Sequence, residues 1–163
     1  PVLRENFVES IFVLQRWRLT RAGELRRGRL VDFHTRHKLS LLAHSPDHYR
    51  EMGRLTAAAK SLQPASLFER YEALLMAALQ RKATVKKNSN VLMHMLGYFK
   101  KQLSADEKAE LLEVIEQYRS EWIPLIVPVT LVKHYVRKYS NAYLGGQVYL
   151  YPHPIELKLR NHV

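Results

Sequence analysis

The feature that most constrains the fold is a helical spacing of apolar residues that recurs along nearly the whole chain. Residues 3–20 show it first, on one stripe made of Leu3, Phe7, Ile11, Leu14 and Trp17. Glycine, proline and capping residues then divide the chain into helices expected over about 28–44, 45–62, 64–82, 88–103, 104–122 and 129–140. Alternation typical of a strand appears only briefly, at 147–151. The sequence therefore predicts an all-α single domain over residues 1–163, a helical bundle of about seven helices.

Local signals mark where several of these helices begin and end. Ser45-Pro46 combines a capping hydroxyl with a proline at the first helical position. The string Ser104-Ala105-Asp106-Glu107 is a capping box, in which a hydroxyl and a carboxylate each accept a hydrogen bond from a free N–H group. Pro124 and Pro128 predict an extended link before the last long helix. The glycine and proline pairs of 145–154 predict a loop-rich C-terminal segment, with one short helix from Pro154 onward.

Composition excludes several classes of protein. The 163 residues, 47% of them hydrophobic, suffice for one core. The chain has no cysteine, which removes disulfides, thiolate nucleophiles, iron–sulfur ligation and cysteine-type zinc sites. No apolar run approaches the roughly 20 residues of a membrane span, and the first residues do not resemble a signal peptide. We therefore expect a soluble cytoplasmic domain, not embedded in a membrane, with no cofactor of its own.

Charge is distributed unevenly along the chain. The formal net charge is +11, from 26 Lys and Arg against 15 Asp and Glu. Residues 104–122 hold six acids and two bases, a local charge of −4, so the rest holds 24 bases against 9 acids, or +15. A surface of one sign favours polyanionic partners such as nucleic acid or an anionic membrane face. The alternative is that the charge serves solubility alone.

The helix expected over 88–103 carries the most informative polar face. Its apolar residues, Leu92, Leu96, Phe99 and Leu103, lie opposite that face and predict the core side. Cations suit phosphates, an amide and an imidazole suit hydrogen bonds, and a phenol suits base stacking. The alternative is a solvated face whose glycine serves helix packing. The polar sector spans about 120° and contains Lys86, Lys87, Asn90, His94, Gly97, Tyr98 and Lys101.

Histidines form a second candidate group, on the helix expected over 28–44. His34, His37 and His44 share one face, and an i,i+3 pair of imidazoles can ligate zinc or iron. No carboxylate on that face completes a ligand set, so we predict no metal. The histidines then either line a polar cleft or bond to carbonyls inside the core. Arg36 and Lys38 point away from His37 and can reach a phosphate.

The last long helix and the tail supply a third face. On the helix the cations and a histidine lie on one side, and they are Lys133, His134, Arg137 and Lys138. Along the tail, tyrosines alternate with glycines and cations, namely Tyr143, Tyr149, Tyr151, Lys158, Arg160 and His162. Such a mixture suits stacking on unpaired bases. The alternative is that the tyrosines pin the tail to the core.

Several strings together resemble the YbgA-like family over nearly the whole chain. They are Val31-Asp32-Phe33-His34-Thr35-Arg36-His37-Lys38, Gly97-Tyr98-Phe99-Lys100-Lys101-Gln102-Leu103-Ser104, and residues 42–46, 90–94, 123–128, 147–154 and 159–163. That family occurs alone or fused behind a cysteine-bearing domain that resembles thiouracil desulfidases, in which an iron–sulfur cluster removes sulfur. The resemblance implies an RNA-binding role in desulfidation of 4-thiouridine in tRNA. Residues 1–7 resemble the segment just past the junction, which favours an excised or standalone module.

We therefore expect a tRNA-binding accessory module that is not an enzyme by itself, with no catalytic residue assigned. An iron–sulfur cluster would belong to a fused or partner desulfidase domain. The alternatives are a small enzyme, with or without a metal, whose cleft of His34, His37, His44 and His94 acts on a nucleotide or metabolite, and a scaffold that docks through its acidic helix. The predicted RNA contacts are Arg36, Lys38, Lys86, Lys87, Asn90, His94, Tyr98, Lys101, Lys133, Arg137 and Arg160.

Overall fold

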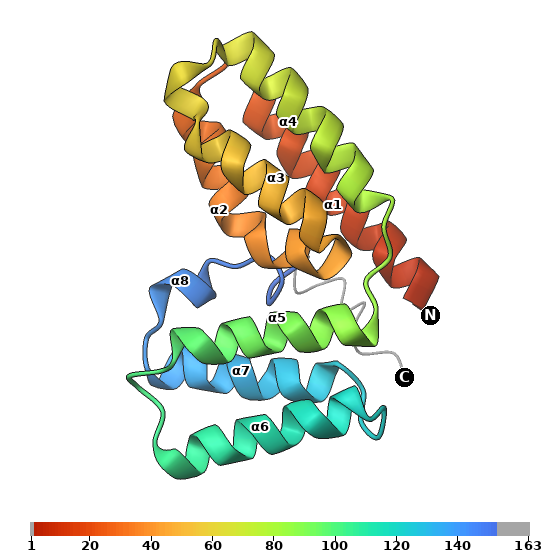
Figure 1. Cartoon of the computed structure of the whole chain (residues 1–163), viewed down its shortest axis with the longest axis vertical. Helices are drawn as coiled ribbons and strands as arrows, with labels where there is room; N and C mark the ends of the chain where they lie inside the picture. The colour runs from red at the N-terminus through yellow and green to blue at the C-terminus, as the bar shows by residue number, and fades with distance from the viewer. Residues whose placement is uncertain (1, 153–163) are drawn as a thin grey trace.

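The computed structural model describes residues 2–152, with side chains from Arg4 onward, and this part of the chain is helical throughout (Figure 1). It contains no strand, which confirms the predicted all-α class. None of its helices is both long enough and apolar enough to cross a membrane. The elements are α1 (Val2–Arg21), α2 (Arg27–His44), α3 (Pro46–Ala57), the 3-10 turn η1 (Ala59–Ser61), α4 (Pro64–Leu79), α5 (Val85–Tyr98), α6 (Ala105–Arg119), α7 (Ile126–Lys138) and α8 (Ala142–Gly145).

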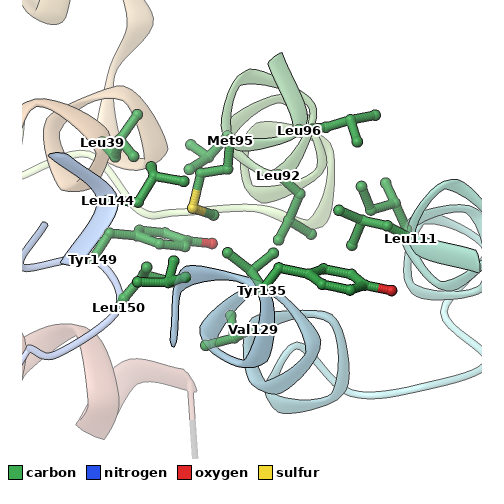
Figure 2. Close-up of a cluster of buried hydrophobic side chains, with 14 of the residues drawn as sticks. Leu39, Leu92, Met95, Leu96, Leu111, Val129, Tyr135, Leu144, Tyr149 and Leu150 are labelled. Carbon is green, nitrogen blue, oxygen red and sulfur yellow. The ribbon is translucent and has the colours of Figure 1, made fainter. Parts of the chain in front are cut away.

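Two hydrophobic clusters form the core, and α2 contributes to both. The first lies among α1 to α4, where the Trp17 indole ring stacks on Phe68 and Tyr71. The second lies among α5 to α8 and the last turns of α2 (Figure 2). Tyr49 of α3 packs against both clusters. The helices α1 to α4 therefore form one layered half, and α5 to α7 form the other, with α8 between them (Figure 1).

Two helix starts, those of α3 and α6, follow the local signals of the sequence, and the start of α5 does not. The Ser45 hydroxyl accepts a hydrogen bond from the N–H of His48, with Pro46 as the first residue of α3. The capping box of α6 is confirmed, because the Ser104 hydroxyl and the Glu107 carboxylate each accept a backbone N–H of the other. The start of α5 was predicted too late, because its cap is Thr84.

The predicted extended link before α7 is wrong at Pro128. This proline is the third residue of α7, and it is buried. The first four N–H groups of a helix have no carbonyl partner within it, so a proline there loses no hydrogen bond. Helix α5 also ends earlier than expected, at Tyr98 rather than Leu103, and α8 was not expected.

The predicted stripe of α1 does not face the core as a whole. Val13 and Trp17 are buried, but Phe7 is 67% exposed and Ile11 is 47% exposed. Trp17 of the expected stripe is buried and its Nε1 donates to Glu72 of α4, and Val13, which lies outside the stripe, is buried as well. The apolar spacing thus predicted the helix correctly, but only part of the predicted stripe is buried.

The C-terminal segment 147–152 is a series of turns held against α1, α2 and α5. The N–H of Val148 donates to the carbonyl of Arg36, and the Tyr149 hydroxyl donates to the Asn88 side chain at 2.9 Å. The Arg16 guanidinium donates to the carbonyl of Pro152 at 2.7 Å. The short helix predicted from Pro154 onward lies outside the described residues.

Because α2 supports both clusters, we expect the two halves to unfold together. Leu39 belongs to the α5–α8 cluster and Trp17 to the other. Leu39→Ala should lower the free energy of unfolding by about 2–5 kcal/mol, measured in denaturant by Trp17 fluorescence. Leu19→Ala, at an exposed leucine, is the control and should change it by less than about 0.5 kcal/mol. If Leu39→Ala leaves the unfolding transition reported by Trp17 unchanged, the two halves unfold separately.

The carboxylate of Glu107 should make the stability of the fold depend on pH in the acidic range. Hydrogen bonds from the Lys138 ammonium, the Tyr139 hydroxyl and the Ser104 N–H lower the pKa of Glu107 from 4.5 to about 2. This stabilisation is complete above pH 4.5, the value in the unfolded chain, and disappears as pH falls towards 2. Glu107→Gln should therefore lower the melting temperature at pH 7, and the difference from the parent protein should shrink below pH 4.5. Asp106→Asn is the control. If Glu107→Gln lowers the melting temperature by the same amount at pH 7 and below pH 4.5, the low pKa assigned to Glu107 is contradicted.

Candidate nucleic-acid interface

The polar sector of α5 is exposed as predicted, and we name it the α5 ridge: Lys86, Asn90, His94, Gly97, Tyr98 and, in the turn after the helix, Lys101. A side chain at Gly97 would meet nothing within 4 Å, so this glycine does not serve helix packing. Lys86 and Lys101 form no ion pair within the described part of the chain. The ridge therefore presents cations whose charge is not neutralised by neighbouring acids.

An aromatic pair joins the ridge to α8. The rings of Tyr98 and Tyr143 stack with centroids 4.5 Å apart and an interplanar angle of 29°. Tyr98 is 45% exposed, whereas burial raises the pKa of Tyr143 and keeps that hydroxyl neutral. The pair thus forms a supported aromatic surface at one end of the ridge, which suits stacking on a base.

Lys87, a predicted phosphate contact, is engaged inside the protein. Its ammonium donates to the carbonyl of His44 at 2.7 Å and to that of Lys82 at 2.8 Å. The last carbonyls of a helix lack partners within it, so this lysine completes the end of α2. A role in binding RNA would require Lys87 to give up both bonds.

The other predicted cations lie away from the ridge. Arg36 is exposed on α2 beside segment 147–152, and Lys133 of α7 places its ammonium 4.8 Å from the ring centre of Tyr151 in the same segment. Tyr149 of that segment bonds to Asn88, which lies about 160° around α5 from Asn90. The structure therefore divides the cations into the ridge and a second group. The second group is Arg36, Lys133 and Arg137.

Two predicted contacts belong to neither group. Lys38 is half-buried and lies close enough to His34 to lower the pKa of its imidazole. Arg160 lies outside the described residues. On α7, Lys138 forms an ion pair with Glu107 at 2.5 Å, so its charge is engaged within the protein.

The histidines of α2 are buried and contact different elements. His34 forms a hydrogen bond through Nδ1 with the Tyr71 hydroxyl of α4 at 3.0 Å. The Nδ1 of His37 donates to the carbonyl of Phe33, and that of His44 donates to the carbonyl of Arg81. Their Nε2 atoms are buried without a hydrogen bond. His94 instead is exposed on the ridge, so the structure does not gather the four into one cleft.

Burial governs the charge of two of these imidazoles. It lowers the pKa of His34 and of His37 from 6.5 to about 4, with Lys38 adding to the effect at His34 and Arg16 at His37. Both are therefore neutral at pH 7. Among residues 4–152, no group of three or more histidines and carboxylates is placed to hold a metal ion.

A hollow of about 350 Å³ adjoins the ridge, between α5 and α6. Six of its lining residues were missed in the sequence, namely Ser89, Met93, Leu112, Ile115, Glu116 and Arg119. One signal was available, because Met93 is an apolar residue within a polar sector, three positions after Asn90. A second hollow, of about 460 Å³, lies between α1 and α4 beside Glu72. No histidine lines either of them.

The buried imidazoles predict acid sensitivity. The unfolded chain takes up protons near pH 6.5 and the folded chain only near pH 4, so stability is full above pH 6.5 and falls as pH drops towards 4. Each histidine contributes a slope of up to about 1.4 kcal/mol per pH unit. His37→Gln should reduce the slope between pH 6.5 and 4, measured by denaturant unfolding, with His94→Gln as the control. A parent protein of constant stability over this range contradicts the interpretation.

Comparisons with known proteins identify relatives of the chain. A family model described as "Protein of unknown function (DUF1722)" matches residues 38–154. The chain is also 35% identical over 151 residues to the uncharacterized protein YbgA of Escherichia coli (strain K12), covering 91% of this chain and 89% of that protein. No solved structure matches it. The match to more than half of the chain and the identity to YbgA place the chain in the DUF1722 family of YbgA-like proteins.

Proposed function

We propose that this chain binds RNA, with tRNA as its substrate, through the α5 ridge. One observation carries the proposal: Lys86 and Lys101 have no acidic partner in the described part of the chain, and they share the ridge with Asn90 and the exposed ring of Tyr98. Cations that contact phosphates supply most of the affinity for RNA, because they release condensed counterions. Exposed aromatic rings add stacking on unpaired bases.

The distribution of acids supports the same face. The acids of α6 begin beyond the turn that follows α5, and two of the early ones, Glu107 and Glu110, are used within the protein. Glu107 pairs with Lys138, and Glu110 accepts the Tyr135 hydroxyl at 2.6 Å. These contacts face α7, so they do not neutralise the ridge. The ridge is thus the exposed face on which cations, an amide and an aromatic ring coincide.

The chain acts in this proposal as an accessory module rather than a catalyst. An iron–sulfur cluster does not fit it, because clusters are held by cysteine thiolates and the sequence contains none. Sulfur removal from 4-thiouridine would therefore need a separate cysteine-bearing domain, fused or associated, with this chain holding the tRNA. The site of action would be the cytoplasm, where tRNA is used.

The proposal predicts tRNA binding that weakens steeply with salt. The logarithm of affinity should fall by about 0.7–0.9 per phosphate contact for each unit of log salt. The double variant Lys86→Glu, Lys101→Glu should weaken binding of unmodified tRNA by at least about tenfold at 50 mM salt and make the slope shallower by about 1.4–1.8. Fluorescence anisotropy at 50 and 200 mM salt measures both.

The control for this experiment is Lys60→Glu, Lys108→Glu. It makes the same change of charge at two exposed lysines off the ridge. If the control weakens binding as much as the ridge variant does, net charge rather than the ridge is responsible. If the parent protein binds tRNA without salt dependence, the ridge does not hold phosphates.

A further inference from the structure

We propose that the hollow between α5 and α6 receives one unpaired nucleobase of the RNA held on the ridge. This inference rests on the proposed function and adds which part of the RNA the site recognises. The hollow is continuous with the ridge, because Lys86 and Asn90 belong to both. Its volume of about 350 Å³ lies at the lower end of the range for small-ligand sites, which suits a single base rather than a duplex.

The walls of the hollow are apolar and open to solvent. Met93 of α5 is 46% exposed and Leu112 of α6 is 36% exposed, and the two line the same hollow from different helices. Ile115 also lines it and is buried. Two large apolar side chains on facing helices can cover both faces of a flat ring, and the flexible thioether of methionine adapts to its shape.

Hydrogen-bonding groups stand at the rim. The Asn90 amide has no hydrogen-bond partner within residues 4–152, and it offers a donor and an acceptor side by side, the pattern that pairs with a base edge. The Glu116 carboxylate lies 3.8 Å from the Arg119 guanidinium, so its oxygens retain capacity to accept an exocyclic amino group. The rim thus matches a base with an amino group, adenine, cytosine or guanine, better than uracil.

Charge decides which part of the RNA enters. Lys86, Glu116 and Arg119 all line the hollow, and the other lining residues are uncharged. A phosphate placed there would face the Glu116 carboxylate, whereas a base is neutral and can donate to it. We infer that the backbone stays on the ridge and that a base turns towards α6.

The test compares RNA with and without unpaired bases. The probes are a 12-nucleotide oligoadenylate and a 12-base-pair duplex, measured by anisotropy at fixed salt. The parent protein should prefer the single strand. Leu112→Trp, which fills the hollow, and Asn90→Ala, which alters only an exposed amide, should each weaken single-strand binding by about tenfold, the effect of losing one stacked base. Leu112→Trp, at a residue outside the ridge, should leave duplex binding unchanged.

Leu19→Trp is the control, because it makes the same substitution at an exposed leucine on α1. Oligouridylate should bind more weakly than oligoadenylate. If both hollow variants bind the single strand as the parent protein does, the hollow does not hold a base, although RNA binding by the ridge survives; a hollow that instead accepts a peptide gives this result. If the ridge variant Lys86→Glu, Lys101→Glu binds every probe as the parent does, the proposed function fails, and this inference with it.

Discussion

The burial of the last turns of α2 between two hydrophobic clusters is the constraint on which the rest of the structure depends. Residues 39–45 at its end are all buried, although they include two serines and a histidine. Leu39 faces the α5–α8 cluster and Leu41 faces the α1–α4 cluster. A helix end covered on both sides needs partners for its polar groups. At His44 both the imidazole and the carbonyl find partners in the segment that leads into α5 and in its first turn, whereas the Ser40 hydroxyl forms no hydrogen bond.

Those polar contacts also position the ridge. The His44 imidazole donates to the carbonyl of Arg81, and the Lys87 ammonium donates to the carbonyl of His44. Both bonds join the end of α2 to the link and first turn of α5, where the Thr84 cap begins the helix. The rotation of α5 is thereby fixed, with Asn88 inward and Lys86 and Asn90 outward. A cation assigned to RNA from the sequence, Lys87, proves to be part of this internal framework.

Helical spacing predicted the elements better than it predicted their orientation. The class, the order of the long helices and the capping box at Ser104 were readable, because each depends on residues a few positions apart. The exposure of Phe7 was not, since it depends on how α1 packs against α2 and α4. For the site, the sector from Lys86 to Tyr98 was readable from α5 alone. The partners Tyr143 and Leu112 were not, because they reach the ridge only through tertiary packing.

The acidic helix α6 borders the α5 ridge and carries the opposite charge. Its first carboxylates are held by α7, where Glu107 binds Lys138, so they leave the positive field of α5 intact. Farther along, Glu116 is 66% exposed and only loosely paired with Arg119. A polyanion following the ridge therefore meets repulsion at α6 just where the wall of Met93 and Leu112 offers apolar surface. The Glu116 carboxylate disfavours a phosphate at this position and accepts a hydrogen bond from a base amino group. The same residue therefore keeps the RNA backbone on the ridge and favours entry of a base with an amino group.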